Sequence, residues 1–181
     1  MTKFHSINPK WPISHNYPRF IKKAHEIVNQ YGKPAVHFDI HGYSSHKDLW
    51  FELGYLITNS DLDRGYLRAS DSSIRSLASR AAKSGISFTS LVRGRDSLGN
   101  MFQEAGYKAI PSPAWPSPSR GSHGKYYRGG YTTQTWGSKE GGNIDCIQME
   151  LPPEPRTKSE VHGPQIGKIL AAFVNKWYPS Y

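Results

Sequence analysis

The chain has 181 residues, a length that fits one domain with a real hydrophobic core. Its formal net charge of +9 favours anionic partners such as nucleic acid, an acidic membrane surface or a carboxylate substrate, but the basic residues are scattered rather than gathered in a run. A single cysteine, Cys146, excludes an intrachain disulfide, and the lack of any apolar run of about 18 residues excludes a membrane-spanning helix.

The first 18 residues form the predicted irregular arm, with three prolines, two histidines and no apolar periodicity. They lack the apolar segment of a signal peptide, so we expect a cytoplasmic protein. We therefore divide the chain into an arm over residues 1–18 and one α/β domain over residues 19–181.

Apolar residues at helical spacing predict a helix over Arg19–Gln30. Gly32 fits the end of this helix, and Pro34 prevents its continuation. Ala35–His41 follows as a strand in which apolar and polar residues alternate.

The rest of the chain alternates between the two element types. The predicted strands are Phe51–Thr58, Ile86–Leu91, Tyr107–Ile110 and Asn143–Leu151. The predicted helices are one that begins at Asp71 or Ser72 and runs through Lys83, one at Leu98–Ala105 capped by Ser97, and one at His162–Lys176. Asn59–Ser70 and the proline-rich Pro111–His123 are predicted loops. This order predicts an α/β sandwich with a central mixed sheet.

Polar residues on the strand 35–41 are the first candidate site. His37, Asp39 and His41 share one face, Gly42 ends the strand, and His46 follows closely. Imidazole and carboxylate groups are zinc ligands, and an Asp two residues before a His can orient it. The alternative is that these histidines are ordinary surface residues.

Glu150 is the second candidate, because it ends an apolar strand just before Pro152 and Pro153. A partly desolvated carboxylate at that place could act as a general base. The alternative is a solvated carboxylate at a strand end. Cys146, on the same strand, is expected to be a buried, inert thiol.

Arginines and tyrosines make the third candidate group. Arg128 is the best candidate for binding a substrate carboxylate, because Gly129 and Gly130 allow a ligand to approach the backbone. Tyr131 and Arg156 are further candidates. The chain has no phosphate-binding loop, dinucleotide fingerprint or nucleophile elbow.

Several motifs together resemble the N-formylglutamate amidohydrolase family, and with it the wider zinc carboxypeptidase and aspartoacylase group. They keep the family's order from about His15 onward. The matching residues are Asp39-Ile40-His41-Gly42, Glu52-Leu53-Gly54-Tyr55, Gly94 with Ser97-Leu98-Gly99, Pro111-Ser112-Pro113, Tyr127 with Gly129-Gly130-Tyr131, and Ile147-Gln148-Met149-Glu150-Leu151 with Arg156.

The resemblance implies a three-layer, zinc-carboxypeptidase-like sandwich and a zinc-dependent hydrolase that cleaves an amide next to an acidic amino acid. It implies His41 as a zinc ligand, Asp39 as its orienting partner and Glu150 as general base. His37 and His46 are the candidates for the other ligands. Ser97 joins Arg128, Gly130, Tyr131 and Arg156 as the expected substrate-binding residues.

One departure from the family pattern concerns the metal. The family takes its first two zinc ligands from an N-terminal His followed by an acidic residue, and this chain has no His-x-x-Glu or His-x-x-Asp. The sequence therefore also fits a silent family remnant that binds a small acidic ligand or a protein partner. A homo-oligomer or a partner chain would then cover the place of the missing segment. A basic nucleic-acid-binding module is a third alternative, for which the scattered charges give little support.

Overall fold

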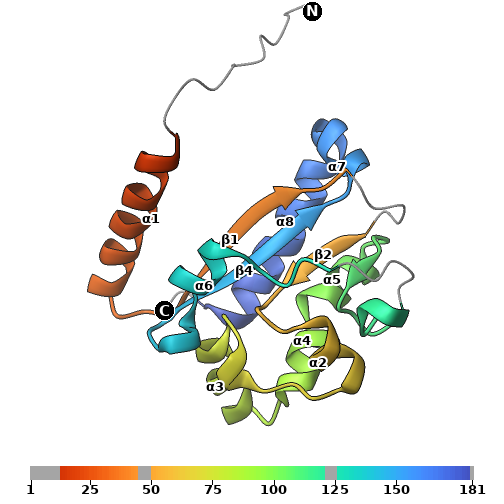
Figure 1. Ribbon diagram of the computed structural model, residues 1–181, viewed down its shortest axis with the longest axis horizontal. Helices are drawn as coiled ribbons and strands as arrows, with labels where there is room; N and C mark the ends of the chain where they lie inside the picture. Colours follow the sequence, from red (N-terminus) through yellow and green to blue (C-terminus); the bar gives the residue numbers. More distant parts are fainter. Residues whose placement is uncertain (1–12, 45–49, 121–125, 180–181) are drawn as a thin grey trace, which may run out of the picture. The chain divides into compact units, whose positions relative to one another are not determined.

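The computed structural model describes residues 13–44, 50–120 and 126–179 (Figure 1). The chain forms two compact units, residues 1–33 and residues 34–181. Helix α1, Ile13–Gln30, belongs to the first unit, and all other described elements belong to the second.

Helix α1 begins at Ile13, not at Arg19, so the prediction of an irregular arm over residues 1–18 is wrong for its last six residues. The predicted boundary between residues 18 and 19 falls inside this helix. The helix ends where the sequence predicted, since Gly32 follows with a positive φ of 63° and Pro34 lies two residues further on. The rest of the predicted arm lies outside the described residues.

Four strands form one mixed sheet in the order β1-β4-β2-β3 (Figure 1). Their bounds are Ala35–Gly42 for β1, Phe51–Gly54 for β2, Ala109–Ile110 for β3 and Ile144–Leu151 for β4. Strand β4 pairs parallel with β1 and antiparallel with β2, and β2 pairs parallel with β3. The predicted α/β class with a mixed sheet is confirmed.

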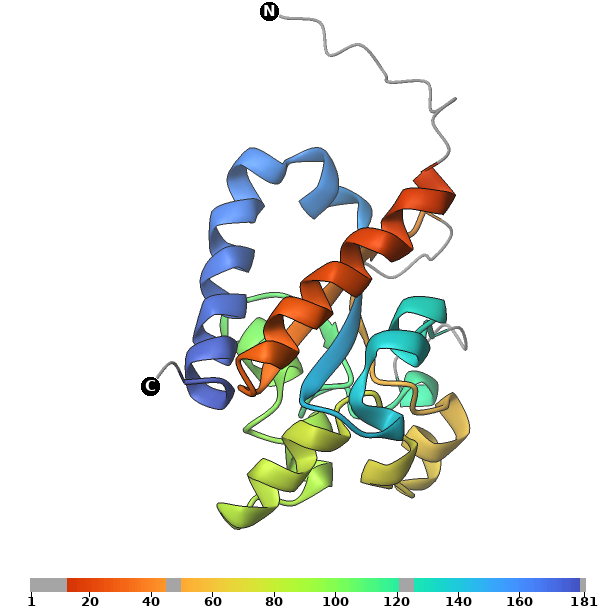
Figure 2. The same ribbon diagram turned by 90° about the vertical axis from the view of Figure 1, so that its left-hand side faces the viewer.

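The helices of the second unit are mostly short. They are α2 at Asn59–Arg64, α3 at Arg75–Lys83, α4 at Phe88–Arg93, α5 at Leu98–Glu104, α6 at Tyr131–Trp136, α7 at Pro153–Thr157 and α8 at Ser159–Trp177. The described residues also contain 3-10 turns, which are η1 at Ala69–Asp71, η2 at Pro118–Arg120 and η3 at Ser138–Glu140. Helices α6 and α8 lie on opposite sides of the sheet in both views (Figures 1 and 2).

Alternation along the strands gives the sheet one apolar face and one polar face. The apolar face contains Leu53 and Met149, both fully buried in the main hydrophobic core. Phe38 of β1 packs edge-on against Phe173 of α8, with ring centroids 6.3 Å apart. Phe51 of β2 stacks on Phe102 of α5. The polar face carries the candidate site.

Two predictions of local structure are wrong because helix caps decide these segments. Ile86–Leu91 was predicted as a strand, but the Ser87 hydroxyl accepts a hydrogen bond from the Ser90 amide and begins α4. Asn59–Ser70 was predicted as a loop, but Thr58 caps α2 in the same way. The predicted strand Phe51–Thr58 ends already at Gly54, and Leu56 then takes a positive φ of 67°.

Asp145 connects β4 to the helices around it. This carboxylate is fully buried and accepts hydrogen bonds from the Leu77 amide, the Ser138 and Tyr178 hydroxyls and the Arg80 guanidinium, at 2.5–3.2 Å. Arg80 also lies over the Tyr178 ring, 4.8 Å from its centroid. One buried acid therefore holds α3, η3 and the end of α8 against the start of β4.

We predict that Asp145→Ala lowers the free energy of unfolding by about 3–5 kcal/mol, because the substitution leaves buried donors and a cation without their acceptor. Urea denaturation measures this change. Asp71→Ala is the matched control, since Asp71 pairs with Arg68 at the surface and its loss should cost less than about 1 kcal/mol. Equal losses in the two variants would contradict the proposed role of Asp145.

Candidate functional site

The sheet brings His41, Glu150 and Glu52 into one row across three strands. His41 of β1 pairs with Glu150 of β4, and Glu150 pairs with Glu52 of β2. Directly paired residues project their side chains from the same face of a sheet. The imidazole and the two carboxylates therefore share the polar face.

An open pocket of about 340 Å³ lies at the end of this row. Its lining residues are His41, Gly42, Tyr43, Ser44, Tyr127 and Glu150. The His41 side chain is about half exposed, whereas Glu150 is 6% exposed. The pocket thus holds an accessible imidazole beside a largely desolvated carboxylate.

Asp39 fixes the position of the His41 ring. Its Oδ2 lies 3.0 Å from His41 Nε2, and its side chain is buried. In the neutral imidazole this contact places the proton on Nε2 and leaves the lone pair on Nδ1. Nδ1 is then the nitrogen that can face a ligand, and the orienting role of Asp39 stays a prediction.

The next row of the sheet supports Glu150. Gln148 pairs with Asp39 on one side and with Gly54 on the other. Its Nε2 donates a 3.0 Å hydrogen bond to Glu150 Oε1. This contact holds the Glu150 carboxylate in place beneath the pocket.

Glu52 is the residue that the site prediction missed. It is fully buried, and its Oε2 accepts a 2.8 Å hydrogen bond from the Tyr127 amide. A sequence signal was available, because a glutamate inside the apolar run Phe51–Thr58 must be buried with partners if that run is a strand. What the sequence could not give was the antiparallel register that pairs Glu52 with Glu150.

Residues 126–130 cross the polar face of the sheet as a strap, the name used below for this segment. The Tyr126 hydroxyl donates to the Leu53 carbonyl, and the Leu56 amide donates to the Arg128 carbonyl. Burial raises the pKa of Tyr126 well above its ordinary value, with smaller contributions from Tyr55 and Glu52, so it stays a neutral donor. The strap brings Tyr127 to the pocket.

Glycine at position 54 makes this crossing possible. A Cβ atom there would lie 2.6–2.7 Å from backbone atoms of Tyr127, Arg128 and Gly129. Real Cβ atoms do not approach backbone so closely, so the strap rests directly on the bare backbone of Gly54.

The predicted substrate-binding residues fall into three places. Arg128 is exposed on the strap and donates to the Leu56 carbonyl at 3.3 Å, while Gly130 lies beside Gln148 and Tyr131 is 71% exposed at the start of α6. Arg156 of α7 donates to the Tyr43 carbonyl at 2.6 Å and packs over Gly42, so it supports the pocket wall.

Ser97 lies apart from this group. It is fully buried and caps α5, where its hydroxyl accepts from the Asn100 amide and donates to the Gly94 carbonyl. Both of its hydrogen-bonding roles are used locally, and it does not line the pocket. Its match to the family motif is explained by helix capping.

The predicted zinc ligands are only partly brought together. His37 lies further back on β1, opposite Cys146, and burial lowers its pKa against the opposing effect of Asp39. His46 lies outside the described residues. Over residues 13–44, 50–120 and 126–179, no three His, Cys, Asp or Glu side chains are grouped so as to hold a metal ion. A three-ligand zinc site does not form from these residues alone.

Cys146 is not a nucleophile in this arrangement. Its side chain is fully buried in β4, and burial raises the pKa of its thiol, with further contributions from Asp39 and Asp145. The thiolate is therefore absent near neutral pH, as expected from the sequence.

Comparison with known proteins identifies no relative of this chain. No protein-family model matches the chain, and neither the curated proteins nor the solved structures contain a match. In the part of the chain that the structure describes, no helix has the length and apolar character needed to cross a lipid bilayer.

We predict that Gly54→Ala displaces the strap and lowers the free energy of unfolding by about 1–3 kcal/mol, because the added methyl group overlaps backbone atoms. Urea denaturation measures the stability, and the amide resonance of Tyr127 reports the displacement. Gly167→Ala is the control, since a Cβ in that helix meets nothing within 4 Å. It should be neutral or stabilising by up to about 1 kcal/mol. An unchanged Tyr127 resonance in Gly54→Ala would contradict the proposed packing.

Proposed function

We propose that this chain is an amidohydrolase that cleaves an N-acylated acidic amino acid, with N-formylglutamate as the model substrate. The observation that carries the proposal is the pairing of His41 with Glu150 on adjacent strands, where both line one pocket and Asp39 holds the imidazole. A carboxylate and an oriented imidazole side by side are the groups that amide hydrolysis needs for proton transfer.

Glu150 is the proposed general base. It lines the pocket, whereas Glu52 is fully buried and already accepts from the Tyr127 amide. Glu150 takes a proton from the attacking water and returns it to the leaving amine. The Gln148 side-chain amide donates to Oε1 of Glu150 and positions this carboxylate at the pocket.

His41 and the strap complete the proposed reaction site. Nδ1 of His41 faces away from the Asp39 contact and is the proposed contact to the water or to the amide carbonyl. Arg128 and Tyr131 are the proposed contacts to the substrate carboxylate, since both are exposed near the pocket-lining Tyr127. The positive net charge of the chain favours such an anionic substrate.

The zinc ion and the three-layer, zinc-carboxypeptidase-like architecture remain part of the proposal. They are supported by the quoted motifs and by the helices on both sides of the mixed sheet. The described residues offer His41 Nδ1 as one ligand. If zinc is bound, it would supply Lewis-acid chemistry in the pocket.

We predict that Glu150→Gln lowers kcat for N-formyl-L-glutamate hydrolysis about 10²–10⁴-fold, because glutamine cannot accept the proton. The fold should survive, since a glutamine at this position keeps the oxygen that accepts from Gln148. Release of L-glutamate measures the rate. Glu160→Gln is the control, an exposed glutamate on α8 whose loss should leave kcat unchanged. Full activity of Glu150→Gln would remove Glu150 from the base role.

The second candidate function is a silent remnant of the family that binds a small acidic ligand or a protein partner. The incomplete group of metal-ligand side chains in the described residues favours it. Metal analysis separates the two candidates.

For the zinc-dependent enzyme we expect about one zinc per purified chain, lost in His41→Ala, because the substitution removes the one ligand that the pocket supplies. Elemental analysis measures the metal content. His162→Ala is the control, a histidine that contacts Tyr107 on another part of the fold. A chain that carries no metal near neutral pH and no hydrolytic activity supports the remnant.

A further inference from the structure

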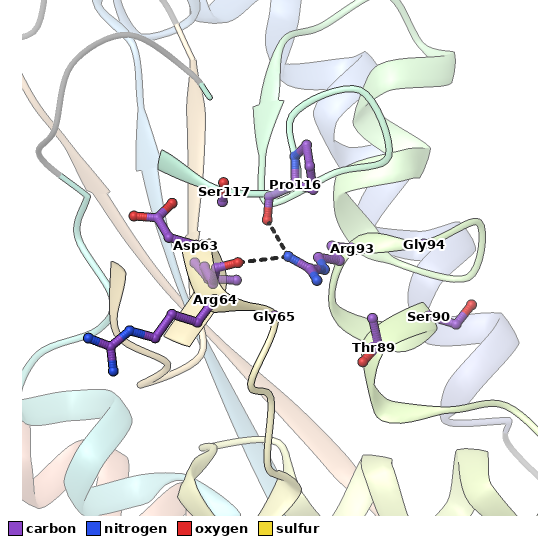
Figure 3. A pocket seen from close by; sticks show the side chains of 10 residues that line it. Asp63, Arg64, Gly65, Thr89, Ser90, Arg93, Gly94, Pro116 and Ser117 are labelled. Carbon is purple, nitrogen blue, oxygen red and sulfur yellow. Dashed lines mark hydrogen bonds between the residues drawn. The ribbon is translucent and has the colours of Figure 1, made fainter. Parts of the chain in front are cut away.

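A second pocket, larger than the first, lies between the end of α2, helix α4 and the proline-rich loop (Figure 3). Its volume is about 570 Å³, within the range of small-molecule sites. It shares no lining residue with the His41 pocket. The lining residues are Leu62, Asp63, Arg64, Gly65, Thr89, Ser90, Arg93, Gly94, Pro116 and Ser117.

Arg93 is held rigidly in this pocket by one edge of its guanidinium. Nη1 donates to the Leu62 carbonyl at 2.8 Å and to the Pro116 carbonyl at 3.3 Å, as the dashed lines in Figure 3 mark. Leu62 belongs to the last turn of α2, so this contact also satisfies a carbonyl at a helix end. The guanidinium is thereby fixed at the meeting point of three segments.

The other edge of the Arg93 guanidinium remains available to a ligand. Over the described residues, Nε and Nη2 make no hydrogen bond with protein atoms. Nη2 lies against Gly65, where a Cβ would approach it to 3.3 Å. Arg93 is half buried and immobilised through Nη1. Its Nε–H and Nη2–H groups therefore present two parallel hydrogen-bond donors in one plane.

The charges of the lining favour a single negative charge in the ligand. Two arginines and one aspartate give the lining residues a net charge of +1. Burial would raise the pKa of Asp63, but hydrogen bonds from Ser119 and Ser117 outweigh it and hold the pKa below its ordinary value. Asp63 is therefore ionised, and it disfavours a phosphate dianion more than a carboxylate.

We propose that this second pocket binds a small carboxylate ligand, with the Nε–Nη2 edge of Arg93 as its two-point anchor. Arg64 is a further cationic residue of the lining, and Thr89 contributes a hydroxyl to it. The proposal is independent of the hydrolase activity proposed above, because the two pockets have no residue in common.

The test uses the full ¹⁵N-labelled chain, titrated at pH 7 and constant ionic strength with sodium acetate, sodium phosphate or sodium chloride. We expect acetate to cause saturable shifts at the Arg93 Nε–H and at the Gly65 and Thr89 amides, with a millimolar dissociation constant. Phosphate should bind more weakly, and chloride should cause no saturable shift.

Thr89→Asp is the decisive variant. Position 89 is the second residue of α4, where an aspartate suits the helix dipole, so the fold should be kept while the new charge repels the anion. We expect the acetate dissociation constant to rise at least about tenfold. Ser60→Asp is the matched control, since it places the same charge at the second residue of α2 outside the pocket lining, and binding should change less than about twofold.

Arg93→Lys provides a second variant, which keeps the charge but loses the paired donors, and it should also weaken acetate binding. Three results would overturn the proposal. They are acetate shifts that do not saturate, acetate binding that is unchanged in Thr89→Asp, and saturable shifts confined to His41 and Tyr127. Tighter binding of phosphate than of acetate would overturn the assignment to a carboxylate.

Discussion

The position of β4 between β1 and β2 is the constraint on which the rest of the second unit depends. Strand β4 runs parallel to β1 and antiparallel to β2, so its register fixes both neighbours at once. Asp145 near its start holds the surrounding helices, and Glu150 near its end lies in the candidate site. One eight-residue strand therefore carries both the main polar contact of the scaffold and the proposed base.

Four buried carboxylates lie on or beside this strand, and burial of a charge is costly unless donors surround it. Asp145 meets that requirement with four donors, and Glu52 accepts from the strap. Asp39 contacts the His41 imidazole, and Glu150 accepts a hydrogen bond from the Gln148 side-chain amide. Of these four carboxylates, Glu150 is the one that lines the His41 pocket in the described part of the chain. The same residue type thus serves the scaffold at Asp145 and lies at the candidate site at Glu150.

The sequence predicted the long, strongly patterned elements well. Strands β1 and β4, the cap of α5 by Ser97 and the end of α1 all follow from local rules of alternation and capping. The predictions of short elements failed. The six residues of Ile86–Leu91 fit either a strand or a helix by their pattern, and the cap by Ser87 makes them a helix.

Part of the candidate site could likewise be predicted from the sequence, and part could not. His41, Asp39 and Glu150 could be named from strand ends and motifs, and the sheet brings them together. Glu52 could not be placed beside them, since antiparallel pairing of β2 with β4 joins residues about a hundred positions apart. Ser97 was predicted both as a helix cap and as a substrate-binding residue; its hydroxyl caps α5, and it does not line the pocket.

The wall of the His41 pocket depends on Arg156, which is not one of its lining residues. Its guanidinium reaches from α7, just after β4, to the Tyr43 carbonyl, just after β1, and its side chain lies over Gly42. Two parallel strands are thereby tied together beyond their last paired residues, where strands otherwise fray. The tie is made by an arginine at the surface, next to the ladder position where His41 pairs with Glu150. Loss of this tie would release the pocket wall at Gly42 and Tyr43 while the pairing of His41 with Glu150 remained.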